Sequence, residues 1–152
     1  GSDVGRAGLA RRRGTAPRQL VIHRMLLEDL VRIAREQEQA GASDLRQDVA
    51  AAAIEVEIAK LNNWRTLTRL VRGEPLGPES SFIKLYWSEM SQRMHDTVMR
   101  ALGPRAALCG ADAPTRGRLA DSWLYYRAAS IFAGTSEVQR NIIAQRVLGL
   151  PR

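Results

Sequence analysis

The sequence predicts an all-α domain: an antiparallel four-helix bundle with an additional C-terminal helix. Apolar residues recur at three- and four-residue steps over long stretches, as on one face of a helix. Gly and Pro gather at a few points that would separate helices. The alternation of apolar and polar residues that indicates a half-buried strand is not found. With 152 residues, 45% of them hydrophobic, the chain can bury one core.

The first helical stretch is expected from Asp3 to Ala40. Pro17 is expected either to kink it or to start a second piece, because proline has no amide proton to donate inside a helix. The pattern is strongest from Leu20 to Arg35, and Gly41 follows as a C-cap. The apolar stripe of this helix is predicted to comprise Val21, Met25, Leu26, Leu30 and Ile33.

The second helix is expected from Asp44 to Arg72. Asp44 and Gln47, three residues apart, form a capping box that would satisfy free amide groups at the helix start. The run from Gly73 to Pro78 ends the helix. A wide arc of apolar residues predicts more than one buried face: Val49, Ala53, Val56, Ile58, Leu61, Trp64, Leu67 and Val71.

The third helix is expected from Ser80 or Ser81 to Gly103 and Pro104, and residues 105–116, rich in Gly, Pro and Ala, are expected to form an irregular loop. Its apolar stripe comprises Ile83, Trp87, Met90, Met94, Val98 and Ala101, and we interpret Trp87, Met90 and Met94 as bundle core.

A fourth helix is expected over residues 119–129, and the last helix begins at Ser136 after a short turn. Ser136 with Gln139 is the predicted cap of this helix. Gly149 and Pro151 end it.

Composition narrows the classes of function. The net charge of +7 would suit a nucleic-acid-binding protein, but no aromatic residue interleaves the densest basic run, Arg11–Arg13, so a base-stacking surface is not indicated. Cys109 is the only cysteine, which excludes an internal disulfide, and with two histidines it gives no metal-binding pattern. His23 and His95 are expected on helix surfaces or partly buried.

The remaining composition fits a cytoplasmic protein that does not enter a membrane. No apolar run approaches membrane-spanning length, and the N-terminus lacks the apolar stretch of a signal peptide. Gly1 and Ser2 look like the scar of a purification tag, which leaves residues 3–152 as the domain.

The segment 131–144 reads Ile-Phe-Ala-Gly-Thr-Ser-Glu-Val-Gln-Arg-Asn-Ile-Ile-Ala. It resembles the closing motif of acyl-CoA dehydrogenases: an aromatic residue, Glu or Gly, Gly-Thr, Asn or Ser, Glu, an aliphatic residue and Gln-Arg. A lone Gly-Thr would mean little, but eight or more matched positions at the end of the chain are specific. Residues 9–14, 36–41 and 81–103 also resemble family segments, so the resemblance spans nearly the whole chain. It covers only the family's C-terminal domain.

The resemblance implies a part in the FAD-dependent oxidation of acyl-CoA thioesters, in which a carboxylate removes the α-proton and the β-hydrogen leaves as hydride to the flavin. It implies close approach of the Gly134 backbone to FAD, a hydroxyl from Thr135 to a flavin oxygen, and a cofactor contact for Glu137. Taken alone, the same residues also suit an ordinary helix entry, with Glu137 complementing the helix dipole.

The residues depart from the family at the positions that matter for catalysis. One family branch places the base just before Gly-Thr, where this chain has Ala133, and the other places it where our alignment has Arg12. Neither side chain can accept a proton, so we name no catalytic residue. Gln37 and Ala40 replace the Arg and Phe that contact a neighbouring subunit's flavin, and Pro104 replaces the second Gly of a Gly-Gly loop.

We therefore expect a subunit that lacks its own base and forms a homo- or hetero-oligomer with acyl-CoA dehydrogenase subunits. We expect the complete enzyme to bind FAD and acyl-CoA, this chain alone to hold no FAD, and extra apolar faces on the second and third helices to cause self-association. Three alternatives stay open: an active protein whose base lies elsewhere, a basic helical module that binds nucleic acid, and a purely structural module.

Overall fold

Every secondary-structure element in the described part of the chain is helical, which confirms the predicted all-α class. The computed structural model describes residues 17–39, 45–78 and 80–151. The main helices are α2 (Pro17–Gln39), α3 (Arg46–Val71), α4 (Ser80–Leu102), α5 (Arg118–Arg127) and α6 (Ser136–Ile142). Short 3₁₀ segments are η1 (Gly103–Ala107), η2 (Gly110–Asp112), η3 (Pro114–Gly117) and η4 (Ala128–Ser130), and η5 (Ile143–Val147) is a π-helical turn.

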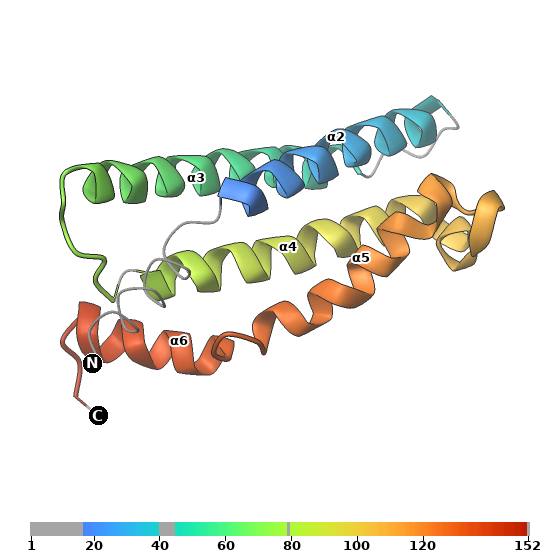
Figure 1. The fold of residues 1–152 in the computed structure, drawn as a ribbon. Helices are drawn as coiled ribbons and strands as arrows, with labels where there is room; N and C mark the ends of the chain where they lie inside the picture. Colours follow the sequence, from blue (N-terminus) through green and yellow to red (C-terminus); the bar gives the residue numbers. More distant parts are fainter. Residues whose placement is uncertain (1–16, 40–44, 79, 152) are drawn as a thin grey trace.

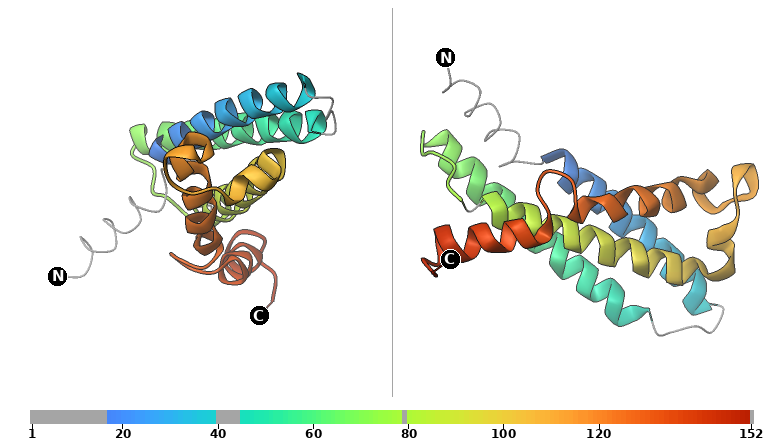
Figure 2. Two further views of the ribbon diagram at one scale, coloured as in Figure 1. Left: turned by 90° about the vertical axis from the view of Figure 1, so that its right-hand side faces the viewer. Right: turned by 90° about the horizontal axis from the view of Figure 1, so that it is seen from below.

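Helix α4 is the centre of the bundle, because it contacts α2, α3, α5 and α6. Helices α2 and α3 form an antiparallel hairpin that lies over α4 and α5 (Figure 1). Helix α6 lies beside the N-terminal half of α4, and the end-on view of Figure 2 shows it on the far side of α4 from the hairpin. This arrangement matches the predicted four-helix bundle with an additional C-terminal helix.

The core is built from apolar side chains of α2, α3, α4 and α5. Met90 and Met94 are fully buried, as predicted, whereas Trp87 is only partly buried. Burial of each such side chain stabilises the fold by about 1.5–3 kcal/mol. The largest fully buried apolar side chains are Leu30, Ile33, Val56, Met90, Met94, Val98 and Leu119.

Two predictions about buried faces are wrong. Val21 and Met25 are more than half exposed, and His23 occupies the core face of α2 with Leu26 and Leu30. Successive residues of a helix are about 100° apart, so His23 shares its face with residues three and seven positions later. Likewise, His95 is fully buried rather than at the surface. Internal hydrogen bonds offset the cost of burying both imidazoles.

Several helix ends differ from the predicted ones. Helix α3 begins at Arg46, two residues late, and the predicted cap Asp44 lies outside the described residues. Helix α6 begins at Ser136 as predicted, but its N-cap is Thr135. Residues 105–116, predicted to be irregular, include three short 3₁₀ segments. Pro17 starts α2, because proline suits the first turn of a helix.

Candidate functional site

The Gly134 turn, which we define as residues 132–137, joins η4 to α6. Ala133 and Gly134 both have positive φ, 57° and 99°. The positive φ favours glycine at residue 134, and a Cβ there would force the flexible Gln139 side chain to move, because it would overlap Nε2. Gln139 donates from Nε2 to the Ala133 carbonyl over 3.3 Å. The turn is thus fastened to the helix that it opens.

Thr135 caps α6. Its φ and ψ of −63° and 160° are extended, and its Oγ1 accepts the amide proton of Val138 at 3.3 Å. Glu137 lies exposed in the first turn. Hydrogen bonds from its own backbone amide and from the Thr135 hydroxyl lower the pKa of the Glu137 carboxyl. The turn therefore presents a hydroxyl and an ionised carboxylate next to a backbone without a side chain.

Helix α4 supports the turn through α6. The Trp87 and Phe132 rings lie 6.2 Å apart, and Arg140 forms an ion pair with Glu89. The contact between α4 and α6 also includes two buried residues, Lys84 and Ser136. The Lys84 ammonium and the Ser136 hydroxyl have no hydrogen-bond partner in the described part of the chain. Burial lowers the pKa of Lys84, while the charges of Glu137 and Glu89 oppose that shift.

A second polar cluster lies deeper, between α2, α4 and α5. We call His23, Ser91, His95 and Ser122 the histidine cluster. Ser91 Oγ donates to the Trp87 carbonyl at 2.7 Å, so its oxygen accepts from His23 Nε2 at 2.5 Å. The Ser91 carbonyl can only accept, so His95 holds its proton on Nδ1, 2.6 Å away, and its Nε2 accepts from the Ser122 hydroxyl at 2.8 Å.

The histidine cluster is neutral at pH 7. Burial, together with the nearby His95, lowers the pKa of His23 to about 4, and burial lowers the pKa of His95. The His95 ring also stacks on Tyr126, whose hydroxyl donates to Gln19 over 2.9 Å. Because the Ser91 hydroxyl is buried and already donates to a carbonyl, it is not an activated nucleophile. The sequence analysis did not identify this cluster. The signal that could have identified it is the spacing of His23 from the buried leucines, which places it on their face of the helix.

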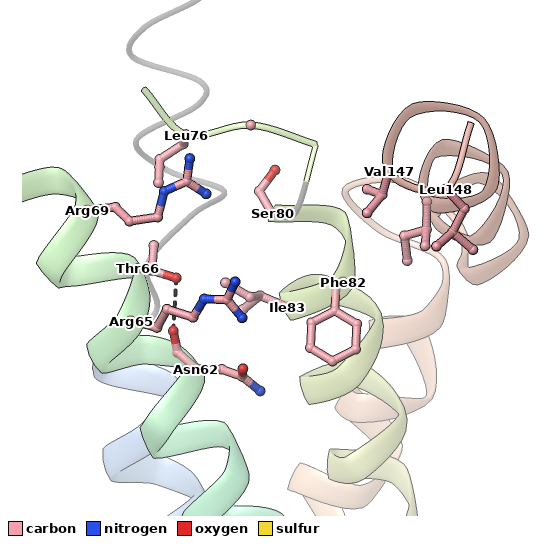
Figure 3. A pocket seen from close by; sticks show the side chains of 12 residues that line it. Asn62, Arg65, Thr66, Arg69, Leu76, Ser80, Phe82, Ile83, Val147 and Leu148 are labelled. Atoms are coloured by element: carbon pink, nitrogen blue, oxygen red, sulfur yellow. Dashed lines mark hydrogen bonds between the residues drawn. The ribbon is translucent and has the colours of Figure 1, made fainter. Parts of the chain in front are cut away.

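A pocket of about 350 Å³ lies between the end of α3, the start of α4 and η5. Figure 3 shows Arg65 and Arg69 on one side of it and Phe82 and Ile83 on the other. Arg69 is engaged by the Glu74 carboxylate at 3.1 Å. Since η5 follows α6, this pocket and the Gly134 turn lie at opposite ends of the same helical segment.

The outward face of α3 is apolar, which we call the α3 outer face. Its residues are 40–89% exposed: Ile54, Ile58, Leu61, Trp64 and Val71. The prediction that α3 buries more than one face within this chain is wrong, because its buried residues share one face. Apolar surface of this kind usually marks an interface.

Other site classes find no support in the described residues. No group of three or more metal-binding side chains occurs among them, and Cys109 is a free, exposed thiol. None of the described helices is long and apolar enough to cross a membrane.

The structure brings Ala133, Gly134, Thr135 and Glu137 together in one turn. The other positions singled out from the sequence do not join them. Pro104 lies in η1 and Gln37 near the end of α2, both at the end of the bundle away from α6 (Figure 1). Arg12 and Ala40 lie outside the described residues.

Comparison with known proteins identifies the family. The model of the acyl-CoA dehydrogenase C-terminal domain matches residues 1–148. The acyl-CoA dehydrogenase IpdE1 of Mycobacterium tuberculosis is 29% identical over 135 residues, which cover 88% of this chain and 34% of that protein. The chain thus spans about a third of the length of this relative.

Solved structures show the same fold. The ChsE4-ChsE5 complex from Mycobacterium tuberculosis matches with a TM-score of 0.72 and 27% identity, over 86% of this chain and 36% of that one. The Tcur3481-Tcur3483 steroid ACAD matches with a TM-score of 0.76 and 24% identity, over 86% and 34%. Since the family model covers nearly its whole length, this chain belongs to the acyl-CoA dehydrogenase family, as a C-terminal helical domain.

Proposed function

We propose that this domain is part of a cytoplasmic, FAD-dependent enzyme that oxidises acyl-CoA thioesters between the α and β carbons, as a subunit without its own catalytic base. The observation that supports this most directly is the Gly134 turn. It keeps the glycine, the capping threonine and Glu137, yet it has alanine at the position where relatives of one family branch hold the base.

The residues of the turn fit a flavin nucleotide. Gly134 brings no side chain of its own, although the Gln139 amide lies beside it, and the half-buried Thr135 and exposed Glu137 offer a hydroxyl oxygen and a carboxylate. Below them, Lys84 and Ser136 have polar atoms that lack partners in the described part of the chain. We propose Gly134, Thr135 and Glu137 as the cofactor contacts; bound FAD would supply the hydride acceptor.

The same turn cannot remove the α-proton. Ala133 has only a methyl group, and Glu137 has a lowered pKa, which makes its carboxylate a weaker base. Loss of a general base costs about 3–5 kcal/mol in the barrier, which corresponds to a rate loss of about 10²–10⁴. A homologous subunit that retains its carboxylate would supply the base in a mixed oligomer.

The α3 outer face is our candidate contact for another acyl-CoA dehydrogenase subunit, a second copy or a homologue. Leu61→Glu places a charge at its centre and should abolish association while leaving the unfolding free energy within about 0.5 kcal/mol, because Leu61 is 58% exposed. Light scattering at high concentration measures this, with Leu124→Glu on α5, where Leu124 is 60% exposed, as the charge-matched control. A monomeric wild-type protein would contradict the proposal.

Enzyme assays test the missing base. The full-length protein is expressed alone and with its nearest homologue, and flavin reduction by acyl-CoA is followed. We expect reduction only on co-expression, retained by Ala133→Gly and lost when the homologue's carboxylate is removed. Robust reduction by the protein alone would show that its base lies elsewhere.

The nucleic-acid alternative is not favoured by the arginines. Several of them form ion pairs with carboxylates, which reduces the positive charge available to phosphates: Arg32, Arg93, Arg100, Arg118, Arg127 and Arg140. Retention on heparin with a steep dependence on salt concentration would revive that alternative.

A further inference from the structure

Lys84 is placed where a lysine is costly. Only 7% of the residue is exposed, and its Nζ has no hydrogen-bond partner in the described part of the chain. Lysine side chains normally extend their ammonium group to water, and an unpaired buried charge lowers stability. Lys60, the other lysine, behaves in the ordinary way, because its Nζ lies 2.8 Å from the Glu57 carboxylate.

A second unpartnered group lies on the helix that packs against this part of α4. Ser136 is 5% exposed, and its Oγ also lacks a partner in the described residues. Among those residues, three buried side-chain polar atoms have no partner, and two of them are Lys84 Nζ and Ser136 Oγ. Native proteins satisfy most buried polar groups, so two orphans on α4 and α6 beside the turn indicate a missing acceptor.

Nearby charges do not supply that acceptor. Glu89 is paired with Arg140. Glu137 lies within electrostatic range of Lys84, but its carboxylate is exposed and forms no hydrogen bond with the ammonium. The ammonium therefore has carboxylates near enough to favour its charged form, and no atom in the described residues to receive its protons.

We propose that Lys84 and Ser136 belong to the flavin-binding machinery, and that both gain their missing hydrogen-bond acceptor when a flavin nucleotide occupies the Gly134 turn. This inference rests on the proposed function. The phosphate and ring-carbonyl oxygens of such a nucleotide are acceptors that match an ammonium and a hydroxyl. Lys84 also offsets the negative charge of Glu137, which would otherwise repel a phosphate.

The test separates binding from folding, using the whole protein that contains this chain in its native assembly. Lys84→Met and Ser136→Ala are compared with wild type, and Lys60→Met is the matched control. Flavin per subunit is measured by absorbance after gel filtration, FAD affinity by fluorescence, and Tm for the flavin-free and FAD-loaded forms.

We expect Lys84→Met to weaken FAD binding at least tenfold and to keep or raise the Tm of the flavin-free protein, because methionine replaces an unpaired charge with an apolar side chain. Ser136→Ala should weaken binding severalfold with an unchanged flavin-free Tm, and it provides the test if Lys84→Met does not fold. Lys60→Met should bind FAD like wild type.

Two results would overturn the inference while leaving the proposed function intact. One is FAD affinity in Lys84→Met and Ser136→Ala equal to that of wild type. The other is a lower Tm of flavin-free Lys84→Met, which would mean that another part of the protein supplies the acceptor. A wild-type assembly that binds no flavin would overturn the proposed function, and this inference with it.

Discussion

Two buried polar regions lie along α4, and they differ in how far the chain satisfies them. In the histidine cluster, His23, Ser91, His95 and Ser122 all have hydrogen-bond partners. Near the Gly134 turn, Lys84 and Ser136 are also buried but lack partners in the described residues. A network in which every polar group has a hydrogen-bond partner holds the helices in place, whereas polar groups without partners are suited to binding a ligand. Stability should therefore depend on the first region and ligand binding on the second.

The largest expected effect is at His95. His95→Ala should destabilise the fold by about 3 kcal/mol, because it leaves a cavity next to Tyr126 and removes hydrogen bonds to Ser91 and Ser122. Urea unfolding measures the loss. Lys84→Met, on the same helix, is the contrast, with no loss expected. If the two variants lost equal stability, the distinction between the regions would fail.

Acid should also weaken the histidine cluster. His23 has a pKa of about 4 in the fold, against about 6.5 when unfolded, so the unfolded chain binds the extra proton first as pH falls. The stabilisation is complete above pH 6.5 and is lost as the pH falls towards 4. Lowering the pH from 7 to 5 should therefore reduce the free energy of unfolding by about 2 kcal/mol through the protonation of His23.

The pH effect is checked by measuring the unfolding free energy at both pH values. The charged groups near the pair are Arg127 and Asp96. His23→Gln, which cannot titrate, should flatten the profile. An equally steep profile in that variant would assign the acid sensitivity to other groups.

How much the sequence predicts also differs between the two regions. The Gly134 turn and the start of α6 can be predicted from local signals, namely a Gly-Thr pair before an apolar helix. The structure has both the turn and the helix start at the predicted positions. The histidine cluster does not, because its hydrogen bonds join residues 68 and 27 positions apart. The burial of Lys84 also cannot be predicted from the sequence, since a lysine in an amphipathic pattern normally indicates the exposed face of a helix.

Local signals have their own limit, which the cap of α6 illustrates. Thr135 and Ser136 are both good N-cap residues, and the pattern with Gln139 favoured Ser136. The structure selects Thr135, because Gln139 is turned back to the Ala133 carbonyl and so holds the turn instead of capping the helix. The contact between the Gln139 side chain and the Gly134 turn thus determines which of the two adjacent residues, Thr135 or Ser136, caps the helix.

Within the turn, Gly134→Ala should cost about 1–2 kcal/mol. The φ of 99° disfavours any side chain, and the new methyl group would displace Gln139 from its hydrogen bond to Ala133. FAD binding by the native assembly should fall as well, whereas His95→Ala should lower stability more than affinity. Unfolding and flavin titration on both variants measure the contrast. Unchanged stability in Gly134→Ala would mean that the turn rearranges freely.

The smallest effect is expected one residue earlier. Ala133 has a φ of 57°, a left-handed conformation that alanine adopts at a cost and glycine without one, while glycine also gives the unfolded chain more freedom. The two contributions partly cancel, so Ala133→Gly should stabilise the fold by about 0.5 kcal/mol. Because Ala133 is exposed and its side chain makes no hydrogen bond, FAD binding and the activity of a mixed oligomer should not change. Chemical unfolding of Ala133→Gly beside Gly134→Ala compares opposite exchanges at neighbouring positive-φ positions. A loss of activity on Ala133→Gly alone would mean that the methyl group has a role at the substrate, and that this position is more than a vacated base.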